Sequence, residues 1–342
     1  MLMKGGVVGA SGYLGAELLR LLASHGEIEV AVVQAESTAG WRLGRLYPSL
    51  EMAYGELEVG EVDPAGLDGL DVVFVAVPAG RSQEIVAELQ GRVGLVVDLG
   101  ADFRLRDEAA YEKWYGFSHS CPELLQDAVY GLVELTRSEL AGARLVAAPG
   151  CYVTAACLGL APFLEQGEVK RSGIIVDAVS GTSGAGKAPS ADLHHPHVNE
   201  QVSPYKVLSH RHIPEMEQVL GAELLFTPHL APMTRGILAT CYAKLTETAS
   251  ISSSKGAVEL LAASYAGQPF VRVTDSLVST GDAYGSNVAH LTARYDERTG
   301  WLVVLSALDN LLKGGSGQAL QAANVALGLP EATGLPLAGL AP

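Results

Sequence analysis

The chain has 342 residues, which is enough for two domains that each bury a core of their own. Hydrophobic residues make up 48% of the chain, a content that excludes an intrinsically disordered protein. The formal net charge of −15 argues against binding to nucleic acid or to anionic membranes, because no basic tract is present to release counterions.

The N-terminus and the hydropathy pattern predict a cytoplasmic protein. Residues 1–6 lead directly into a strand-like run and lack the apolar stretch and cleavage site of a secretory signal. No apolar run approaches the roughly 18 residues that would indicate a membrane span. The four cysteines form no CxxC pair, so we expect thiols in a reducing compartment rather than a zinc site or a disulfide framework.

Continuous apolar runs alternate with helical patterns in the first half of the chain. The runs cover residues 6–9, 28–33, 72–77 and 95–97, and leucines recur at helical spacing over residues 14–22. Uninterrupted apolar strands that alternate with helices are typical of a parallel sheet with both faces covered. We therefore expect an α/β fold that begins with a Rossmann-type dinucleotide-binding domain.

A glycine loop at the end of the first predicted strand is the candidate cofactor site. Gly9, Gly12 and Gly15 lie between a strand and a helix, where they permit a tight turn and let backbone N–H groups approach a pyrophosphate. The residues between them, Ser11, Tyr13 and Leu14, belong to the same predicted site. This spacing differs from GxGxxG and does not name the cofactor.

The residues after the second predicted strand bear on the choice between NAD and NADP. Glu36 favours NAD, because an acidic residue at this place commonly binds the ribose 2′-hydroxyl. Ser37 and Thr38, followed a turn later by Arg42 and Arg45, are instead suited to a 2′-phosphate. The residues alone leave the choice open.

The pattern changes after Pro149 and predicts a second, α+β domain. A helix is expected over residues 151–164, a strand over 173–180, and a loop over most of 181–204. Alternating runs over 237–245, 270–273 and 302–307 predict a mixed or largely antiparallel sheet. A last helix is expected over about 313–327.

Cys151 is the candidate nucleophile. It follows a Pro-Gly turn at the start of a predicted helix, where backbone N–H groups and the helix dipole stabilise a thiolate. Cys157, in the interior of the same helix, fits a buried structural thiol, as do Cys121 and Cys241.

Two histidine clusters have different interpretations. His210 and His212 flank Arg211 at the start of another predicted helix, an arrangement that offers a general base beside an anion clamp. The cluster at residues 194–197 has no carboxylate or cysteine at ligand spacing, so we interpret it as a solvated loop and predict no metal site.

Taken together, these motifs resemble the N-acetyl-gamma-glutamyl-phosphate reductase family, which is related to aspartate-semialdehyde dehydrogenase. The resemblance extends over nearly the whole chain. It rests on residues 9–13 (GASGY), 101–105 (ADFRL), 149–152 (PGCY), 180–186 (SGTSGAG), 210–215 (HRHIPE), 227–230 (TPHL), 232–237 (PMTRGI) and 309–314 (DNLLKG).

The resemblance implies roles for individual residues. It makes Cys151 the nucleophile and His212 the acid/base, with His210 as the second candidate. It implies that the glycine loop binds NADP(H) together with Ser183, Gly184 and Asn310, although Glu36 departs from what a 2′-phosphate needs. The arginines of the matched motifs, expected to bind the substrate carboxylate and phosphate, are Arg104, Arg211 and Arg235.

The resemblance also implies a discontinuous nucleotide domain, residues 1–150 with 310–342, around a catalytic and oligomerisation domain of residues 151–309. It suggests a homo-oligomer, dimer or tetramer. The expected reaction is reduction of N-acetyl-L-glutamyl 5-phosphate, an acyl phosphate of arginine biosynthesis, to its semialdehyde by way of a thioester on Cys151. The alternatives are a lysine-biosynthesis reductase whose substrate is carried by an acidic protein, and a dinucleotide-sensing protein without catalysis.

Overall fold

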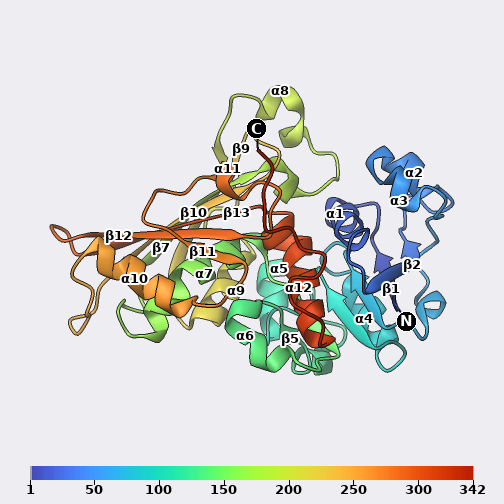
Figure 1. Cartoon of the computed structure of the whole chain (residues 1–342), viewed down its shortest axis with the longest axis horizontal. Helices are drawn as coiled ribbons and strands as arrows, with labels where there is room; N and C mark the ends of the chain where they lie inside the picture. Colours follow the sequence, from blue (N-terminus) through green and yellow to red (C-terminus); the bar gives the residue numbers. More distant parts are fainter. Residues whose placement is uncertain (1, 342) are drawn as a thin grey trace. The chain divides into compact units, whose positions relative to one another are not determined.

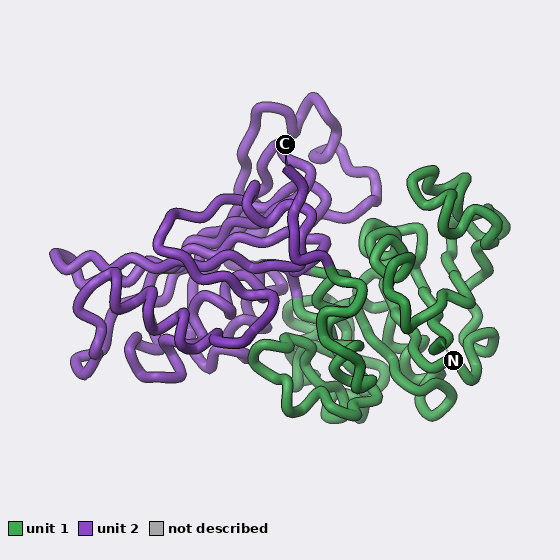
Figure 2. The backbone as a smooth tube through the Cα atoms, in the orientation of Figure 1, with its two compact units in different colours: residues 1–149, 315–335 green, residues 150–314, 336–342 purple. Residues whose placement is uncertain are grey.

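The computed structural model describes residues 2–341, and the chain forms two compact units (Figure 2). Unit 1 comprises Met1–Pro149 and Gly315–Leu335, and unit 2 comprises Gly150–Gly314 and Pro336–Pro342. The expected nucleotide domain also included Gly150, residues 310–314 and residues 336–341. They lie in unit 2, where backbone hydrogen bonds join Asn287 to Pro336 and Leu340 to Tyr284.

Unit 1 contains a six-stranded parallel sheet with the strand order β2-β1-β3-β4-β6-β5 (Figure 1). Its strands are β1 (Met3–Val8), β2 (Ile28–Gln34), β3 (Val72–Val75), β4 (Leu95–Asp98), β5 (Val129–Tyr130) and β6 (Leu145–Ala147). The central strands β3 and β4 are buried along their whole length. This burial explains their uninterrupted apolar runs and confirms the predicted parallel sheet.

The helices of unit 1 include one from the end of the chain. They are α1 (Tyr13–Leu22), α2 (Leu43–Leu46), α3 (Glu51–Tyr54), α4 (Ser82–Leu89), α5 (Ala109–Tyr115), α6 (Val133–Leu140) and α12 (Gly317–Ala326), with the 3-10 turns η1 (Pro48–Leu50), η2 (Pro64–Leu67) and η3 (Pro122–Leu125). Helix α12 packs against α1, α6 and β4. It begins later than expected, because the preceding residues form a π-helical turn, η6 (Leu312–Ser316), in which Gly315 has a non-helical backbone.

Unit 2 contains a seven-stranded mixed sheet with the order β11-β12-β13-β10-β7-β9-β8. Its strands are β7 (Ile174–Gly181), β8 (Ser203–Pro204), β9 (Leu224–Ala231), β10 (Ile237–Lys244), β11 (Val271–Val273), β12 (Ala289–Asp296) and β13 (Trp301–Leu308). The pairs β7/β9 and β11/β12 are parallel and the other four are antiparallel. The structure therefore confirms the predicted α/β fold with a mixed second sheet.

The helices of unit 2 are α7 (Cys151–Glu165), α8 (His195–Val198), α9 (His212–Leu220), α10 (Ser254–Ser264) and α11 (Thr280–Ala283), with the 3-10 turns η4 (Thr182–Ala185) and η5 (Ala191–Leu193). Helices α7, α9 and α10 lie on one side of the sheet (Figure 1). Helix α7 is buried on all sides, which explains why its sequence is apolar around its whole circumference. Within residues 2–341, no helix combines the length and apolar character that a membrane crossing requires.

Candidate functional site

The predicted glycine loop connects β1 to α1 in unit 1 and has the shape of a phosphate cradle. Gly9 has a φ of +87°, and a Cβ there would lie 2.2 Å from the backbone oxygen of Ala76. A Cβ on Gly15 would lie 2.3 Å from the backbone oxygen of Gly9. Gly12 is the N-cap of α1 and provides no side chain to cap the helix. These residues fit a dinucleotide, because the loop ends at the N-terminus of α1 and takes a close-packed form that requires glycine at positions 9 and 15.

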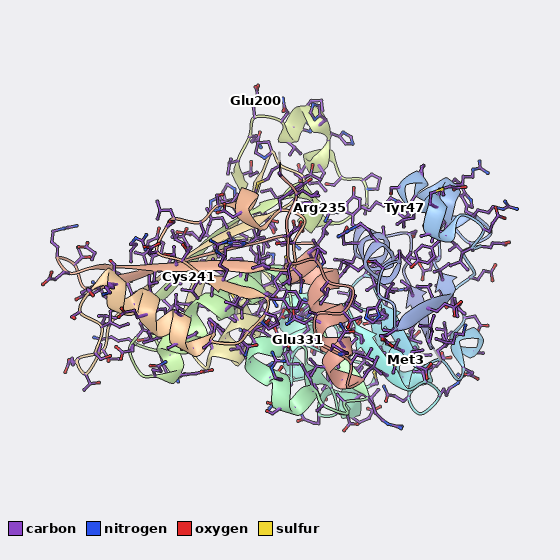
Figure 3. All side chains as sticks on the ribbon, viewed as in Figure 1. Met3, Tyr47, Glu200, Arg235, Cys241 and Glu331 are labelled. Carbon is purple, nitrogen blue, oxygen red and sulfur yellow. The ribbon has the colours of Figure 1, made fainter. Side chains whose placement is uncertain are left out.

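Two distant segments support this loop by hydrogen bonds to its carbonyl groups. The hydroxyl of Tyr47, labelled in Figure 3, donates to the backbone oxygen of Ser11 at 2.6 Å. The hydroxyl of Ser316 donates to the backbone oxygen of Leu14 at 2.7 Å. Tyr13 is exposed at the start of α1. These two bonds hold the loop in place through its carbonyl groups, and the backbone N–H groups beside it belong to the first turn of α1.

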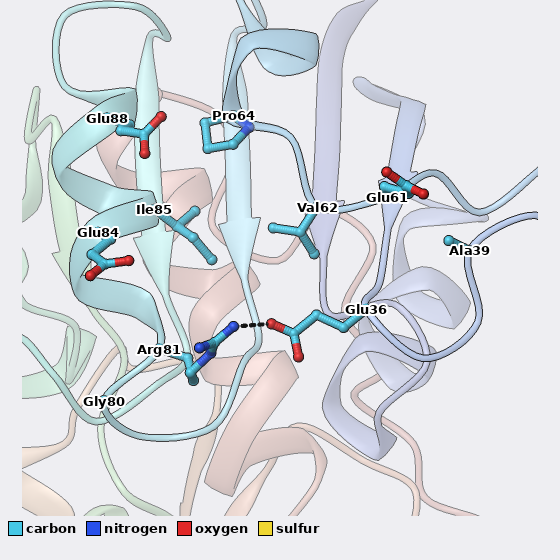
Figure 4. Close-up of a pocket in the computed structure, with 10 residues that line it drawn as sticks. All are labelled: Glu36, Ala39, Glu61, Val62, Pro64, Gly80, Arg81, Glu84, Ile85 and Glu88. Atoms are coloured by element: carbon cyan, nitrogen blue, oxygen red, sulfur yellow. Dashed lines mark hydrogen bonds and ion pairs between the residues drawn. The ribbon is translucent and has the colours of Figure 1, made fainter.

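The residues after β2 lie beside a pocket of unit 1 (Figure 4). Glu36 forms an ion pair with Arg81, and both line the pocket. Ser37 is exposed, and the Thr38 hydroxyl is buried without a hydrogen-bond partner. Of the two arginines considered for a 2′-phosphate, Arg42 pairs with Glu56, and the guanidinium of Arg45 lies 4.9 Å from the centroid of the Trp41 ring.

Cys151 is the first residue of α7 in unit 2, as predicted. Its N-cap, Gly150, has no side chain that could accept a hydrogen bond from the N–H groups of the first turn. Cys151 is half-buried, whereas the other three cysteines are buried. A Cβ on Gly314 would lie 2.9 Å from the Cβ of Cys151, so a glycine-rich turn packs directly against the cysteine.

His212 begins α9, and its ring packs against the residue before the cysteine. A Cβ on Gly150 would lie 2.5 Å from Nε2 of His212 and 2.8 Å from Cδ2. One helical turn later, the buried carboxylate of Glu215 accepts a hydrogen bond from the backbone N–H of Gly150 at 2.8 Å. The start of α9 therefore holds the start of α7 at two points, and it places an imidazole beside the thiol-bearing turn.

His210 lies in an aromatic cluster. Its ring centroid is 4.6 Å from that of His212, 5.8 Å from Tyr152, 5.5 Å from Tyr205 and 5.3 Å from Phe226. Burial, together with the nearby positive charges of Arg211 and Lys206, lowers the pKa of His210 to about 3. Nδ1 accepts a hydrogen bond from the backbone N–H of His212 at 3.1 Å. The ring is therefore neutral near pH 7 and carries its proton on Nε2.

Ser183 and Asn310 lie together in unit 2. The amide nitrogen of Asn310 donates to the Ser183 hydroxyl at 2.9 Å, and its oxygen accepts from the N–H of Gly236 at 2.7 Å. Gly184 is close-packed, since a Cβ there would lie 2.8 Å from the Ser180 hydroxyl. Asn310 thus fixes the η4 turn to the start of β10.

The three candidate arginines have different surroundings. Arg104, in unit 1, is buried and donates to the backbone oxygens of Ala148 at 2.8 Å and Leu99 at 3.2 Å. Arg235, labelled in Figure 3, precedes β10 and lies 3.6 Å from the buried carboxylate of Asp309. Arg211 is exposed at the N-cap of α9. The two arginines of unit 2 therefore retain more solvent access than Arg104.

The remaining cysteines and histidines have structural surroundings. Burial raises the pKa of Cys121 to about 11 and that of Cys241 to about 12, and it raises the pKa of Cys157 well above the usual thiol value. Residues 195–198 form the short helix α8 rather than the predicted loop, although His194, His195 and His197 are exposed as expected. Within the described residues, no group of three or more His, Cys, Asp or Glu side chains is placed to hold a metal ion.

Three further residues shape these sites and were not predicted from the sequence. Glu215 follows His212 by three positions, and this spacing within one helical turn was a usable signal. Tyr152 packs its ring 5.9 Å from that of His212, and its hydroxyl donates to the backbone oxygen of His229. Arg81 gave no signal, because its partner Glu36 is 45 positions away in the sequence.

Comparison with known proteins identifies both units. Residues 4–143 match the family described as "Semialdehyde dehydrogenase, NAD binding domain", and residues 151–310 match "Semialdehyde dehydrogenase, dimerisation domain". The N-acetyl-gamma-glutamyl-phosphate reductase of Symbiobacterium thermophilum is 46% identical over 99% of each chain. The enzyme of the same name from Desulforudis audaxviator is 46% identical over the full length of both chains.

Solved structures share the fold at low sequence identity. Aspartate semialdehyde dehydrogenase II from Vibrio cholerae is 15% identical, with a TM-score of 0.71 over 95% of this chain and 98% of that chain. Aspartate semialdehyde dehydrogenase with NADP from Candida albicans is 15% identical, with a TM-score of 0.69 over the same shares. Given the full-length relatives at 46% identity, the chain belongs to the N-acetyl-gamma-glutamyl-phosphate reductase family.

Proposed function

We propose that this protein is an NADPH-dependent oxidoreductase of arginine biosynthesis that reduces N-acetyl-L-glutamyl 5-phosphate to N-acetyl-L-glutamate 5-semialdehyde and phosphate. The observation that carries the proposal is the half-buried Cys151 at the start of α7, beside the His212 ring that packs on Gly150. Relatives that bear the name of this enzyme match the chain from end to end.

Cys151 acts as the nucleophile. Its thiolate attacks the acyl carbon of the substrate, the bond from that carbon to the phosphate oxygen breaks, and a thioester forms. The backbone N–H groups and the dipole at the start of α7 stabilise the thiolate before the attack. When bound, NADPH supplies the hydride that reduces the thioester carbon. The thiolate then leaves as the aldehyde forms, and it is ready for another substrate.

His212 donates the proton that the oxygen of the reduced thioester carbon needs, and it takes a proton back as the aldehyde forms. Its ring adjoins the turn that bears Cys151. His210 is less suited to proton transfer, because burial keeps it neutral and Nδ1 is occupied by the N–H of His212. We therefore assign His210 a positioning role, in which it orients the first turn of α9.

Arg211 and Arg235 are the proposed anion-binding residues, because guanidinium groups bind carboxylates and phosphates through two hydrogen bonds. Arg235 carries an imperfect ion pair with Asp309, at 3.6 Å, that an incoming anion can replace. Arg104 already binds two backbone oxygens, so we propose that it supports the turns after β4 and β6 and does not contact substrate.

The chain's own residues would hold NADP(H) at two places. The cradle of Gly9, Gly12 and Gly15 with Ser11 would bind the pyrophosphate, and Thr38 has a hydroxyl without a partner beside the end of β2. Ser183 and Gly184, held by Asn310, are the further residues that we propose to contact NADP(H). We also propose a cytoplasmic homo-oligomer, dimer or tetramer, since residues 151–310 match a dimerisation domain.

The reverse reaction tests the proposal. Purified protein is given N-acetylglutamate semialdehyde and NADP⁺, with and without phosphate. Formation of the reduced nicotinamide is followed by its near-ultraviolet absorbance. Reduction that requires phosphate is the expected result. Reduction without phosphate would indicate an aldehyde dehydrogenase in which water resolves the thioester. No reduction, from protein that binds nucleotide, would favour the carrier-linked substrate or the sensing role.

A further inference from the structure

The pocket beside the end of β2 is lined by four glutamates and a single arginine. The glutamates are Glu36, Glu61, Glu84 and Glu88, and Arg81 is the only cationic residue of the lining (Figure 4). A binding site for an anion needs a positive charge at hand, because the overall charge of −15 repels one. Any anion that enters this pocket therefore depends on Arg81.

The pocket lies at the edge of the sheet where the glycine loop is found. Glu36 follows the carboxyl end of β2, and Arg81 follows that of β3, as the N-cap of α4. Strand β1, which ends at the glycine loop, lies between them, and Gly9 packs against the backbone of Ala76 after β3. In open α/β sheets, dinucleotides bind across the carboxyl ends of neighbouring strands, with the ribose beside the second strand.

We propose that Arg81 is the residue that selects NADPH, and that it does so by exchanging partners. Without cofactor, its guanidinium is paired with Glu36. When NADPH binds, the guanidinium takes the 2′-phosphate of the adenosine ribose. NADH has no 2′-phosphate, so the pair with Glu36 stays in place. The inference rests on the proposed function, since it takes the dinucleotide site as given.

The surroundings of the pair make this exchange favourable. The side chains of Arg81 and Glu36 are 62% and 64% exposed, so their ion pair is screened by water and contributes little to stability. A guanidinium can bind a phosphate through two parallel charge-assisted hydrogen bonds, which are stronger. The exchange resolves the apparent conflict in the sequence, because Arg81 supplies, beside Glu36, the positive charge that a 2′-phosphate needs.

Binding of cofactor fragments tests the inference without turnover. Titration calorimetry with 2′,5′-ADP, which carries the 2′-phosphate, is compared with 5′-AMP, which lacks it, and NADPH is compared with NADH. We expect Arg81→Ala to weaken 2′,5′-ADP and NADPH by at least about tenfold, while 5′-AMP and NADH change by less than about threefold. An equal loss of affinity for both ligands of each pair, or no loss of affinity for either ligand, would overturn the inference.

Two further variants separate partner exchange from a general charge effect. Arg81→Lys keeps the charge but loses the two-pronged geometry, so it should recover only part of the affinity for 2′,5′-ADP. Glu36→Gln removes the competing partner and should tighten 2′,5′-ADP severalfold without tightening 5′-AMP. An unchanged or weakened affinity for 2′,5′-ADP in Glu36→Gln would contradict the exchange.

Arg92→Ala is the matched control, because Arg92 forms an ion pair with Asp68 in the same unit and neither residue lines the pocket. It should leave all four affinities unchanged, and a loss there equal to that of Arg81→Ala would overturn the inference. The outcome is independent of the proposed reaction. If turnover fails to require phosphate but Arg81→Ala still weakens 2′,5′-ADP more than 5′-AMP, the proposed reaction alone is rejected. If turnover requires phosphate but Arg81→Ala leaves the preference for 2′,5′-ADP unchanged, the inference alone is rejected.

Discussion

The carboxylate of Glu215 accepts a hydrogen bond at 2.8 Å from the backbone N–H of Gly150, the residue that precedes Cys151. Glu215 and His212 occupy the same turn of α9, so one helix holds the cysteine-bearing turn and presents an imidazole to it. The bond is fully buried, and a buried N–H without a partner costs about 1–3 kcal/mol. The positions of the two proposed reacting groups are therefore coupled through Glu215.

Glu215→Ala should lower kcat and destabilise the protein, whereas Glu215→Gln should retain much of both, because an amide oxygen can still accept from Gly150. Steady-state assays of the reverse reaction and thermal unfolding provide the two readouts. Glu217→Gln, on the same helix, is the control, since Glu217 accepts only a long bond of 3.3 Å from the N–H of Leu224. Equal kcat in Glu215→Ala and wild type would show that the coupling does not matter for the reaction.

Gly150→Ala should reduce kcat on the order of 10²-fold, because the added methyl group would lie 2.5 Å from Nε2 of His212 and displace the ring. Gly256→Ala is a suitable control, since a Cβ there would meet only the Ser253 hydroxyl at an ordinary 3.6 Å. Stopped assays on folded protein, checked by circular dichroism, measure the effect. Near-normal turnover in Gly150→Ala would mean that the ring position is not critical.

Brief treatment with iodoacetamide near pH 7 should label Cys151 before any other cysteine. The other three are buried, and burial raises the pKa of the Cys157 and Cys241 thiols, so little thiolate is present there. Peptide mass spectrometry identifies the labelled residue. Cys151→Ser should lose the label and at least about 10³-fold in turnover, while Cys157→Ser should keep both. Rapid labelling of the Cys151→Ser protein would contradict this prediction, because it would show that another cysteine reacts.

The two histidines should respond differently to substitution by asparagine. His210→Asn should stay within about tenfold of wild-type kcat, because an amide oxygen can replace Nδ1 as acceptor for the N–H of His212. His212→Asn removes the proposed proton donor and should lose at least about 10²-fold. Since the pKa of His210 is about 3, we expect this residue to contribute no inflection to the pH–rate profile between about pH 5 and about pH 9. The reverse order of losses would exchange the two roles.

Asp98, at the end of β4, should make the stability of the protein depend on pH. Burial, together with the negative charge of the neighbouring Asp102, raises its pKa from 3.8 to about 7. The folded state then binds more protons than the unfolded state between those two values, so stability falls as pH rises through this window. Asp98→Asn keeps an acceptor for the Gly100 N–H and should remove this fall in stability. At about pH 8, above the window, the free energy of unfolding of the variant should exceed that of wild type by on the order of a few kcal/mol. Urea unfolding at both ends of the window measures it, and parallel pH curves for the two proteins would contradict the assignment.

The sequence by itself determined the fold class, the glycine loop, and the position of Cys151 at a helix start. These features follow from local rules, because strand and helix periodicity, glycine conformation and helix capping act within a few residues. Strands β9 and β12 escaped prediction, since polar residues interrupt the apolar pattern of both and Pro228 also interrupts that of β9.

Only the tertiary structure decided the partners of the charged and polar groups. Glu215 meets Gly150 across 65 positions, and Arg81 meets Glu36 across 45. The burial that makes His210 neutral comes from Tyr152, Tyr205 and Phe226, which lie in three separate segments. Such contacts depend on how strands and helices pack, and the charge state of a side chain depends on its solvation in that packing, which no local pattern of residues specifies.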